Sequence, residues 1–229
     1  MYIRDLLLLF IFLAIDTPLS VAQSVTPTRL ELNLEESAQA ILTLSSTKPV
    51  DVALELSIAD YSAAGGEVDA PLEIVPPQMV LRPGETRRVL VRWRGEKRLP
   101  VSKSYYLAID ELPLTVGAQE SDAEIQLLTS WRLPVHVEVG GKPEVDFFAP
   151  HIDGSASIEL KNTGRQYALL SHYEIGVKGN REVVVLDGLD LARLLNRDAL
   201  LPGQTVSIPL RLIGLGAVGL QGASLLKKE

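Results

Sequence analysis

The chain of 229 residues contains no cysteine, so it can form neither disulfide bonds nor the cysteine-linked lipid anchor of a bacterial lipoprotein. It has no run of basic residues, and its net charge of −7 argues against nucleic acid as a partner. The apolar stretch at residues 6–15 is half as long as the ~20 residues that a membrane-spanning helix needs. These absences argue against a disulfide-stapled scaffold, a nucleic-acid-binding protein and a membrane-anchored protein.

The common catalytic and metal-binding motifs are also missing. Neither Gly-x-Ser-x-Gly nor His-Glu-x-x-His occurs in the sequence. The histidines His136, His151 and His172 have no paired spacing and no cysteine partner, so we predict no metal site. Residues 214–219 match the dinucleotide-binding fingerprint, but too few residues follow for the required helix and acidic residue. We therefore expect a protein that is not an enzyme and holds no cofactor.

The N-terminus has the order of a secretory signal. Arg4 precedes the apolar residues 6–15, and the small residues Ser20 and Ala22 follow them, which places the expected cleavage before Gln23. We therefore interpret residues 1–22 as a signal peptide. An exported chain without cysteine is typical of the bacterial periplasm, where we expect this protein to be found.

One turn motif occurs twice, as Pro83-Gly84-Glu85-Thr86 and as Pro202-Gly203-Gln204-Thr205, each time ahead of an alternating apolar run. The two glycines lie 119 positions apart, and a second match, between Ser37 and Ser155, lies 118 positions apart. Two sequence matches at nearly the same offset indicate an internal duplication. A period of roughly 120 residues suits one β-sandwich with its linker.

Alternation of apolar and polar residues dominates the sequence. Residues 30–35 and 52–58 alternate with period two, as strands with one buried and one solvated face do. The longest alternating run covers residues 123–139 and contains Pro134, which we expect to lie at a sheet edge because proline donates no ladder hydrogen bond. Residues 189–195 carry leucines at helical spacing and predict a single helical turn.

These patterns predict an all-β fold of two tandem immunoglobulin-like sandwiches. The glycine pair and proline of residues 140–143 are typical of a hinge. We therefore place the N-terminal domain at residues 23–140 and the C-terminal domain at residues 141–229.

Two arginines stand out against this pattern. Arg29 directly precedes the first clean strand, and Arg132 interrupts the long run between Trp131 and Leu133. Arginines in strands usually face solvent, and that interpretation stays open for both.

Four motifs follow one another in a characteristic order. They are Pro27-Thr28-Arg29, the block from Ile74-Val75-Pro76-Pro77 through Leu81-Arg82-Pro83-Gly84-Glu85, Tyr105-Tyr106-Leu107 ahead of Glu111-Leu112-Pro113, and the run from Ile125 to Arg132. With these motifs and the signal segment, the first domain resembles the periplasmic pilus chaperones of the PapD-like, chaperone–usher family. The second domain resembles that family in outline.

The resemblance implies a boomerang of two immunoglobulin-like domains that binds pilin or fimbrial subunits by donor-strand complementation. The lent strand would be residues 123–128, with Ala123, Ile125 and Leu127 inserted into the subunit. Arg29 and Arg132 would anchor the C-terminal carboxylate of the subunit, which a guanidinium can bind through two hydrogen bonds. An outer-membrane usher would receive the subunit, and the exposed strand edge could also pair with a second copy in a self-capping homodimer.

The sequence departs from the family pattern at two places. The second anchor, usually lysine in the family, is Arg132. The positions where the family has an interdomain acid and base correspond to Ser102 and His136. Whether another contact replaces that ion pair is left open by the sequence.

Two other functions are compatible with tandem sandwiches. A structural pilin or adhesin needs an N-terminal donor extension, but only the six residues 23–28 precede Arg29 after the expected cleavage. A carbohydrate-binding or hydrolytic sandwich needs exposed aromatic side chains, whereas Trp93 and Trp131 lie on the apolar sides of their strands. We favour the assembly chaperone and keep the structural pilin or adhesin as the alternative.

Overall fold

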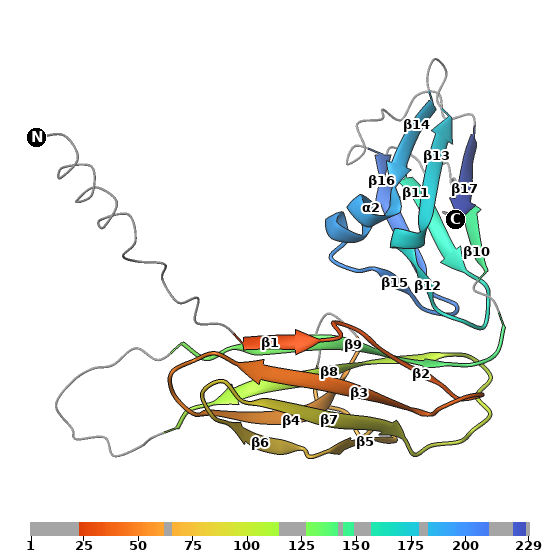
Figure 1. Ribbon diagram of the computed structural model, residues 1–229. Coiled ribbons are helices and arrows are strands. Elements are labelled where there is room, and N and C mark those ends of the chain that lie inside the picture. Colours follow the sequence, from red (N-terminus) through yellow and green to blue (C-terminus); the bar gives the residue numbers. More distant parts are fainter. Residues whose placement is uncertain are drawn as a thin grey trace, which may run out of the picture.

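The computed structural model describes residues 23–61, 66–114, 127–141, 144–148, 157–178, 183–210 and 222–227. Two β-sandwiches meet at a steep angle, and the second stands over one end of the first (Figure 1). None of the helices in this described part is long and apolar enough to cross a membrane. The prediction of an all-β chain with two tandem sandwiches is confirmed.

The first sandwich consists of two sheets. Its strands are β1 (Gln23–Thr26), β2 (Leu30–Asn33), β3 (Gln39–Ser46), β4 (Val52–Asp60), β5 (Leu72–Val75), β6 (Gln78–Leu81), β7 (Thr86–Trp93), β8 (Lys103–Leu112) and β9 (Ser130–Glu138). One sheet has the order β1-β3-β7-β5 and the other the order β2-β9-β8-β4-β6. The chain changes sheets between β1 and β2, so Arg29 lies where the chain enters an edge strand of the second sheet.

The core of this sandwich follows the predicted alternation. In β4, Val52, Leu54, Leu56 and Ile58 are at most 7% exposed, and they pack against the apolar sides of the neighbouring strands. Burying each such side chain contributes about 2 kcal/mol relative to exposure. Trp93 is buried in the same core and Trp131 packs against it, as predicted for both tryptophans.

The second sandwich is smaller. Its strands are β10 (Val145–Phe148), β11 (Ser157–Asn162), β12 (Ala168–Leu169), β13 (Tyr173–Lys178), β14 (Val183–Asp187), β15 (Ala199–Leu200), β16 (Thr205–Pro209) and β17 (Gly222–Lys227). They form sheets of the order β10-β11-β16 and β14-β13-β17, with β12 paired to β15. The residues that match the dinucleotide fingerprint lie outside the described residues.

One local prediction in this domain can be compared with the structure. The helical turn expected at residues 189–195 is confirmed as α2 (Gly188–Leu194), which Asp187 caps by accepting a hydrogen bond from Leu189 N. Between β12 and β13 the chain forms the 3₁₀ turn η1 (Leu170–His172). Asp198 stabilises this turn, since its carboxylate accepts hydrogen bonds from both the N–H and the hydroxyl of Ser171.

The repeated Pro-Gly motif forms the same turn in both domains. Gly84 and Gly203 have φ values of 73° and 75°, in the left-handed region that glycine tolerates best. In each turn, the N–H after the glycine donates to the carbonyl three residues earlier, over 2.9 and 3.0 Å. The glycine N–H groups themselves donate to the carbonyls of Ser46 and Asn162. The two motifs therefore mark equivalent corners, whereas Ser155 of the second match lies outside the described residues.

Candidate functional site

The strand that carries Arg132 has one half open along its edge. β9 pairs with β8 over residues 130–137, but β2 covers it only from Val135 onward. Residues 130–134 therefore have a strand on one side and, among the described residues, none on the other. Pro134 lies at the end of this open half, where a missing N–H costs no ladder hydrogen bond.

The long strand expected from residue 123 begins later in the structure. β9 starts at Ser130, and residues 127–129 precede it outside any strand. Ala123 and Ile125, two of the three predicted donor residues, lie outside the described residues. Leu127, the third, is 84% exposed, the highest value among the large apolar side chains in the described part of the chain. A single exposed leucine is ordinary on a protein surface, so the interest of Leu127 lies in its place beside the open half of β9.

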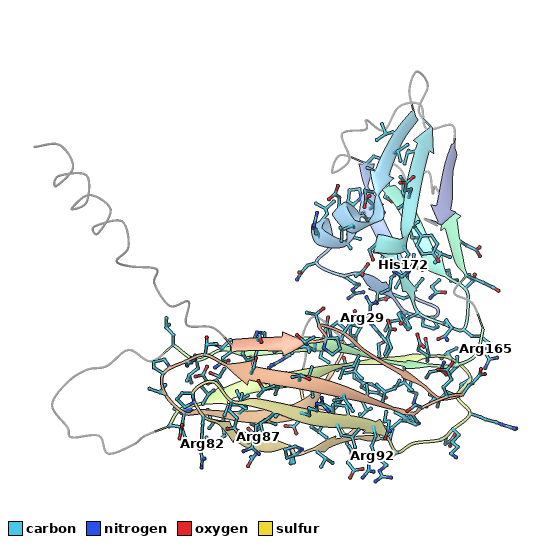
Figure 2. All side chains as sticks on the ribbon, in the orientation of Figure 1. Arg29, Arg82, Arg87, Arg92, Arg165 and His172 are labelled. Carbon is cyan, nitrogen blue, oxygen red and sulfur yellow. The ribbon has the colours of Figure 1, made fainter. Side chains whose placement is uncertain are left out.

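Arg29 and Arg132 lie on the same outer face of the five-stranded sheet. Leu30 is opposite Val135, so Arg29, which directly precedes β2, lies near the Pro134 end of the open half of β9 that also carries Arg132. Figure 2 shows Arg29 on the side of the first domain that faces the second, with Arg87 and Arg92 on the opposite side. The structure thus brings the two predicted anchors to one end of the open edge.

Each of these arginines is held by one carboxylate. Arg29 Nε donates to Glu31 Oε1 over 2.8 Å, and Arg132 Nη1 donates to Asp110 Oδ1 over 2.9 Å. Arg132 Nη1 also donates to Ser130 Oγ and to the Trp131 carbonyl. Burial opposes ionisation of Asp110, but hydrogen bonds from Ser130 and Arg132 outweigh it and lower the pKa of this carboxyl. Both arginine side chains are more than a third exposed, and within the described residues no partner occupies their remaining N–H groups.

Residues 165–167 of the second domain dock onto the first domain, and we call them the docking loop. Arg165 donates from Nε to the Pro100 carbonyl over 2.7 Å, and its own carbonyl accepts a hydrogen bond from Ser102 N over 2.8 Å. Gln166 Nε2 donates to the Val139 carbonyl at the end of β9. Gly141, which follows in the predicted hinge, has a φ of 118°. Main-chain and side-chain hydrogen bonds together therefore fix the second domain against the first.

Ser102 and His136, the positions of the family's interdomain ion pair, lie in this interface. Ser102 Oγ accepts a hydrogen bond from Tyr167 N over 2.8 Å. The ring of His136 stacks on the ring of Tyr167, with centroids 4.0 Å apart and planes inclined by 16°. An aromatic stack and hydrogen bonds thus occupy the place where an acid and a base would pair.

His136 is buried although it lies on the polar side of the alternating run at residues 123–139. It is only 1% exposed, because Tyr167 covers it and Tyr61 contacts its edge. Its Nδ1 lies 2.7 Å from Ser104 Oγ. Burial, together with the nearby charge of Arg29, lowers the pKa of His136 to about 3, so the ring is neutral at physiological pH.

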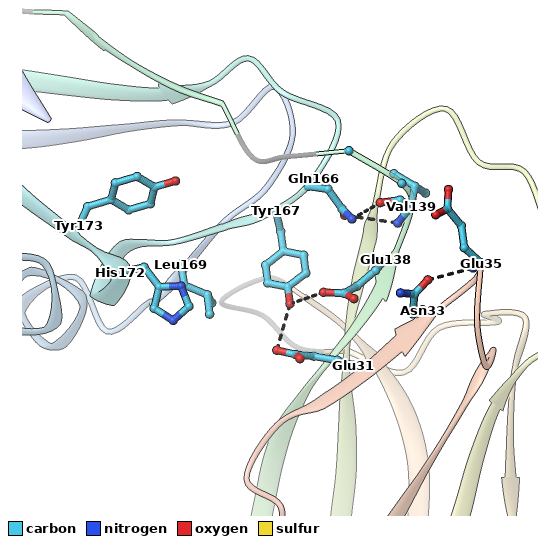
Figure 3. A pocket seen from close by; sticks show the side chains of 12 residues that line it. Glu31, Asn33, Glu35, Glu138, Val139, Gln166, Tyr167, Leu169, His172 and Tyr173 are labelled. Atoms are coloured by element: carbon cyan, nitrogen blue, oxygen red, sulfur yellow. Dashed lines mark hydrogen bonds between the residues drawn. The ribbon is translucent and has the colours of Figure 1, made fainter. Parts of the chain in front are cut away.

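The hydroxyl of Tyr167 reaches two carboxylates of the first domain. It lies 3.1 Å from Glu31 Oε1 and 3.0 Å from Glu138 Oε1 (Figure 3). Burial and the neighbouring charges of Glu138 and Glu31 raise the pKa of Tyr167. These residues line a cavity of about 430 Å³ between the domains, to which Glu35 and His172 also contribute. Neither of the two predicted anchor arginines is among the described residues that line this cavity.

A second buried cluster fixes the start of β9. The carboxylate of Glu111 accepts hydrogen bonds from Lys48 Nζ, over 2.6 and 2.7 Å, from Gln23 Nε2 and from the backbone N–H of Thr129. Glu111 N donates in turn to the Thr129 carbonyl. The exposed Leu127 therefore lies two residues before Thr129, which these hydrogen bonds hold against Glu111 of β8.

Sequence reasoning missed Tyr167, Glu31 and Glu138. Their chemistry depends on contacts across the domain interface, and Tyr167 is 136 positions from Glu31 along the chain. The resemblance to the chaperones did point to Ser102 and His136 as interface positions. Within the described residues, no three His, Cys, Asp or Glu side chains converge in an arrangement that could hold a metal ion.

No family model and no curated protein sequence matches the chain. Solved structures do match it. The E. coli chaperone DraB has a TM-score of 0.59 at 15% identity, with 91% of this chain and 98% of that chain covered. A chain of the CsuC–CsuE complex of a chaperone and a tip adhesion subunit, from Acinetobacter baumannii, has a TM-score of 0.54 at 14% identity, covering 82% and 87%. A chain of the Salmonella enterica SafA pilin complex with the SafB chaperone has a TM-score of 0.57 at 10% identity, covering 82% and 84%.

These likenesses concern the fold. The chain has the architecture of the pilus chaperones, with tandem immunoglobulin-like sandwiches in a boomerang arrangement, as the resemblance in the sequence predicted. At such low identity the shared fold leaves the role of each residue to be argued from the site itself.

Proposed function

We propose that this protein is a periplasmic chaperone that holds a pilin or fimbrial subunit by lending it a strand and passes it to an outer-membrane usher. The observation that carries the proposal is the open half of β9, which ends beside Arg29 and Arg132. An uncovered strand edge next to an exposed leucine is a template for pairing with another chain. The likeness in fold to chaperones solved with a pilin or a tip adhesion subunit supports the same role.

The geometry of the edge favours a partner strand with a free C-terminus. A strand added beside residues 130–134 and parallel to β9 would meet the start of β2 and could extend no further. A chain that ends there would place its terminal carboxylate close to Arg29 and Arg132. Two guanidinium groups with free N–H donors match that carboxylate in charge and in shape.

The alternative, a structural pilin or adhesin, receives less support. A pilin must free its N-terminal segment to complete a neighbouring subunit, whereas residues 23–26 already pair with β3 as the strand β1. Moving them out would cost the ladder hydrogen bonds of that strand and the packing of Val25 against the core.

The test is coexpression of a candidate subunit with the wild-type chain, with Arg29→Glu and with Arg132→Glu. Each charge reversal should reduce recovery of the soluble complex by about tenfold or more, because a charge-assisted hydrogen bond contributes about 1.5–3 kcal/mol and the new carboxylate repels the ligand. Arg87→Glu is the matched control, since Arg87 is exposed, pairs with one glutamate and lies on the side of the first domain opposite Arg29. Equal recovery with all four chains would refute the anchor assignment.

A second variant tests the lent strand independently of the anchor. Leu127→Asp should lower complex recovery as well, because it places a charge where the proposal inserts an apolar side chain. Self-polymerisation of the purified chain, without a copurifying subunit, would instead support the structural pilin.

A further inference from the structure

Tyr167 joins the second domain to the anchor arginine of the first through a single oxygen atom. Glu31 Oε1 accepts from Arg29 Nε over 2.8 Å and lies 3.1 Å from the Tyr167 hydroxyl. In Figure 3 the Tyr167 hydroxyl points between Glu31 and Glu138, whereas Tyr173 lies further off and no hydrogen bond joins it to either carboxylate. The hydroxyl has one proton, so it can donate to only one of the two carboxylates at a time.

The Tyr167 side chain is itself held firmly. It is 7% exposed, its ring lies on His136, and its backbone N–H donates to Ser102 Oγ. His136 is in turn fixed by Ser104. The hydroxyl is therefore presented to Glu31 from a rigid support that belongs to the other domain.

Glu31 and Arg29 have no comparable support of their own. Their side chains are 44% and 37% exposed, and exposed ion pairs are weak because both side chains lose rotamer freedom when they pair. A hydrogen bond from a buried hydroxyl restricts the Glu31 carboxylate, which in turn restricts the Arg29 guanidinium. Arg29 is then pre-organised, with Nη1 and Nη2 left for a ligand.

Arg132 provides the contrast. Its partners Asp110, Ser130 and Trp131 all belong to the first domain. Among the described residues, the second domain thus reaches Arg29 and not Arg132.

We propose that Tyr167 is a positioning residue that orients Arg29 through Glu31, so that the second domain sets the preference of the Arg29 site for a free C-terminal carboxylate. This inference rests on the proposed function, in which Arg29 binds that carboxylate. It assigns the docking loop a role in recognition besides its role in joining the domains.

The first experiment measures binding to the full chain. The probes are two synthetic peptides with the last ten residues of the coexpressed subunit, one with a free carboxylate and one amidated. The wild-type chain should bind the free acid about tenfold more tightly than the amide, as one or two charge-assisted hydrogen bonds allow. Tyr167→Phe should reduce this ratio severalfold, and Tyr173→Phe, a matched loss of one hydroxyl, should leave it unchanged.

The pattern of losses separates positioning from a structural role. Tyr167→Phe keeps the ring on His136, so a weaker affinity for both peptides in equal measure would show a structural role and overturn the inference. Glu31→Ala should reduce the ratio as Tyr167→Phe does, and the double variant should lose no more than either single variant. Additive losses would mean that Tyr167 does not act through Glu31.

The second experiment needs no ligand, so it distinguishes failure of this inference from failure of the proposed function. The NMR signal of Arg29 Nε–H should be protected from solvent exchange in the wild-type chain and in Tyr173→Phe, and it should lose that protection in Tyr167→Phe. An unchanged signal in Tyr167→Phe would overturn the positioning role. If the signal responds as expected but wild type binds acid and amide equally, the proposed anchor function is wrong and Tyr167 positions Arg29 for another purpose.

Discussion

Ser46 in the first domain and Asn162 in the second occupy the same place beside the repeated turn. The carbonyl of each accepts a hydrogen bond from the turn glycine, and the side-chain oxygen of each accepts one from the N–H two residues later, Lys48 and Gly164. Both residues are at most 1% exposed. The scaffold of the corner is therefore the same in the two domains.

The difference is what the side chain does next. Asn162 Nδ2 also donates to the carbonyls of Gln166 and Leu200, over 2.7 and 2.9 Å. Serine at the equivalent place has no second polar group with which to do this. Asn162 thus supports the docking loop at Gln166, next to Tyr167. Duplication provided two equal corners, and one amide group in the second copy supports the loop that contacts the first domain.

The largest predicted effect follows from this comparison. Asn162→Ala should cost about 3 kcal/mol, because it removes three hydrogen bonds of a buried amide at about 1 kcal/mol each, whereas Ser46→Ala removes one and should cost about 1 kcal/mol. The unfolding of the two domains can be followed separately, since Trp93 and Trp131 are the tryptophans of the chain and both lie in the first domain. Tryptophan fluorescence then follows the first domain during denaturant unfolding, and circular dichroism follows both.

Asn162→Ser sharpens the same comparison. It makes the second corner like the first, keeping the acceptor for Gly164 N and removing the two donors. It should recover part of the loss of Asn162→Ala and leave the docking loop unsupported, visible as faster hydrogen exchange at residues 165–167. Equal costs for Asn162→Ala and Ser46→Ala would contradict the different roles of the two side chains.

A second difference between the domains concerns pH. His136 of the first domain is buried and neutral, with its pKa lowered to about 3, whereas His172 of the second domain is exposed. At pH 7 His136 is mostly neutral in both the folded and the unfolded state, so its titration changes the free energy of unfolding little. As the pH falls below about 6.5, the unfolded state takes up a proton that the folded state refuses, so the folded state loses stability.

The expected loss from His136 is about 2 kcal/mol between pH 7 and pH 5, at about 1.4 kcal/mol per pH unit. The groups that face the ring are Ser104 on β8, Tyr61 after β4, Tyr167 of the second domain and the charge of Arg29. His136→Gln should therefore flatten the pH dependence of the fluorescence midpoint, whereas His172→Gln should leave it as in wild type. A wild-type midpoint that is constant from pH 7 to pH 5 would show that the ring takes up a proton without penalty.

The sequence predicted what repeats locally and missed what forms between distant segments. Alternation gave the buried face of β4, and the Pro-Gly motif gave both corners, because each depends on neighbouring residues and on backbone conformation. The burial of His136 could not be inferred from alternation, because a residue of the other domain covers it. The register of β2 on β9 was equally hidden, although it decides which half of β9 stays open and where Arg29 lies.

The smallest predicted effect tests the equality of the two corners. Gly84→Ala and Gly203→Ala should each cost about 1 kcal/mol, because both glycines have φ near +75°, where a Cβ is disfavoured. Apart from the chain neighbours, no atom of the described residues lies within 4 Å of a Cβ built at either position, so the cost is conformational and should be the same in both domains. Gly66→Ala is the matched control. Its Cβ also meets no atom of the described part within 4 Å, but its φ is not positive, so the substitution should be neutral or slightly stabilising. If fluorescence and circular dichroism gave costs for Gly84→Ala and Gly203→Ala that differ by more than about 1 kcal/mol, the corners would differ in their backbones as well. The contrast between Ser46 and Asn162 would then no longer isolate the effect of one side chain.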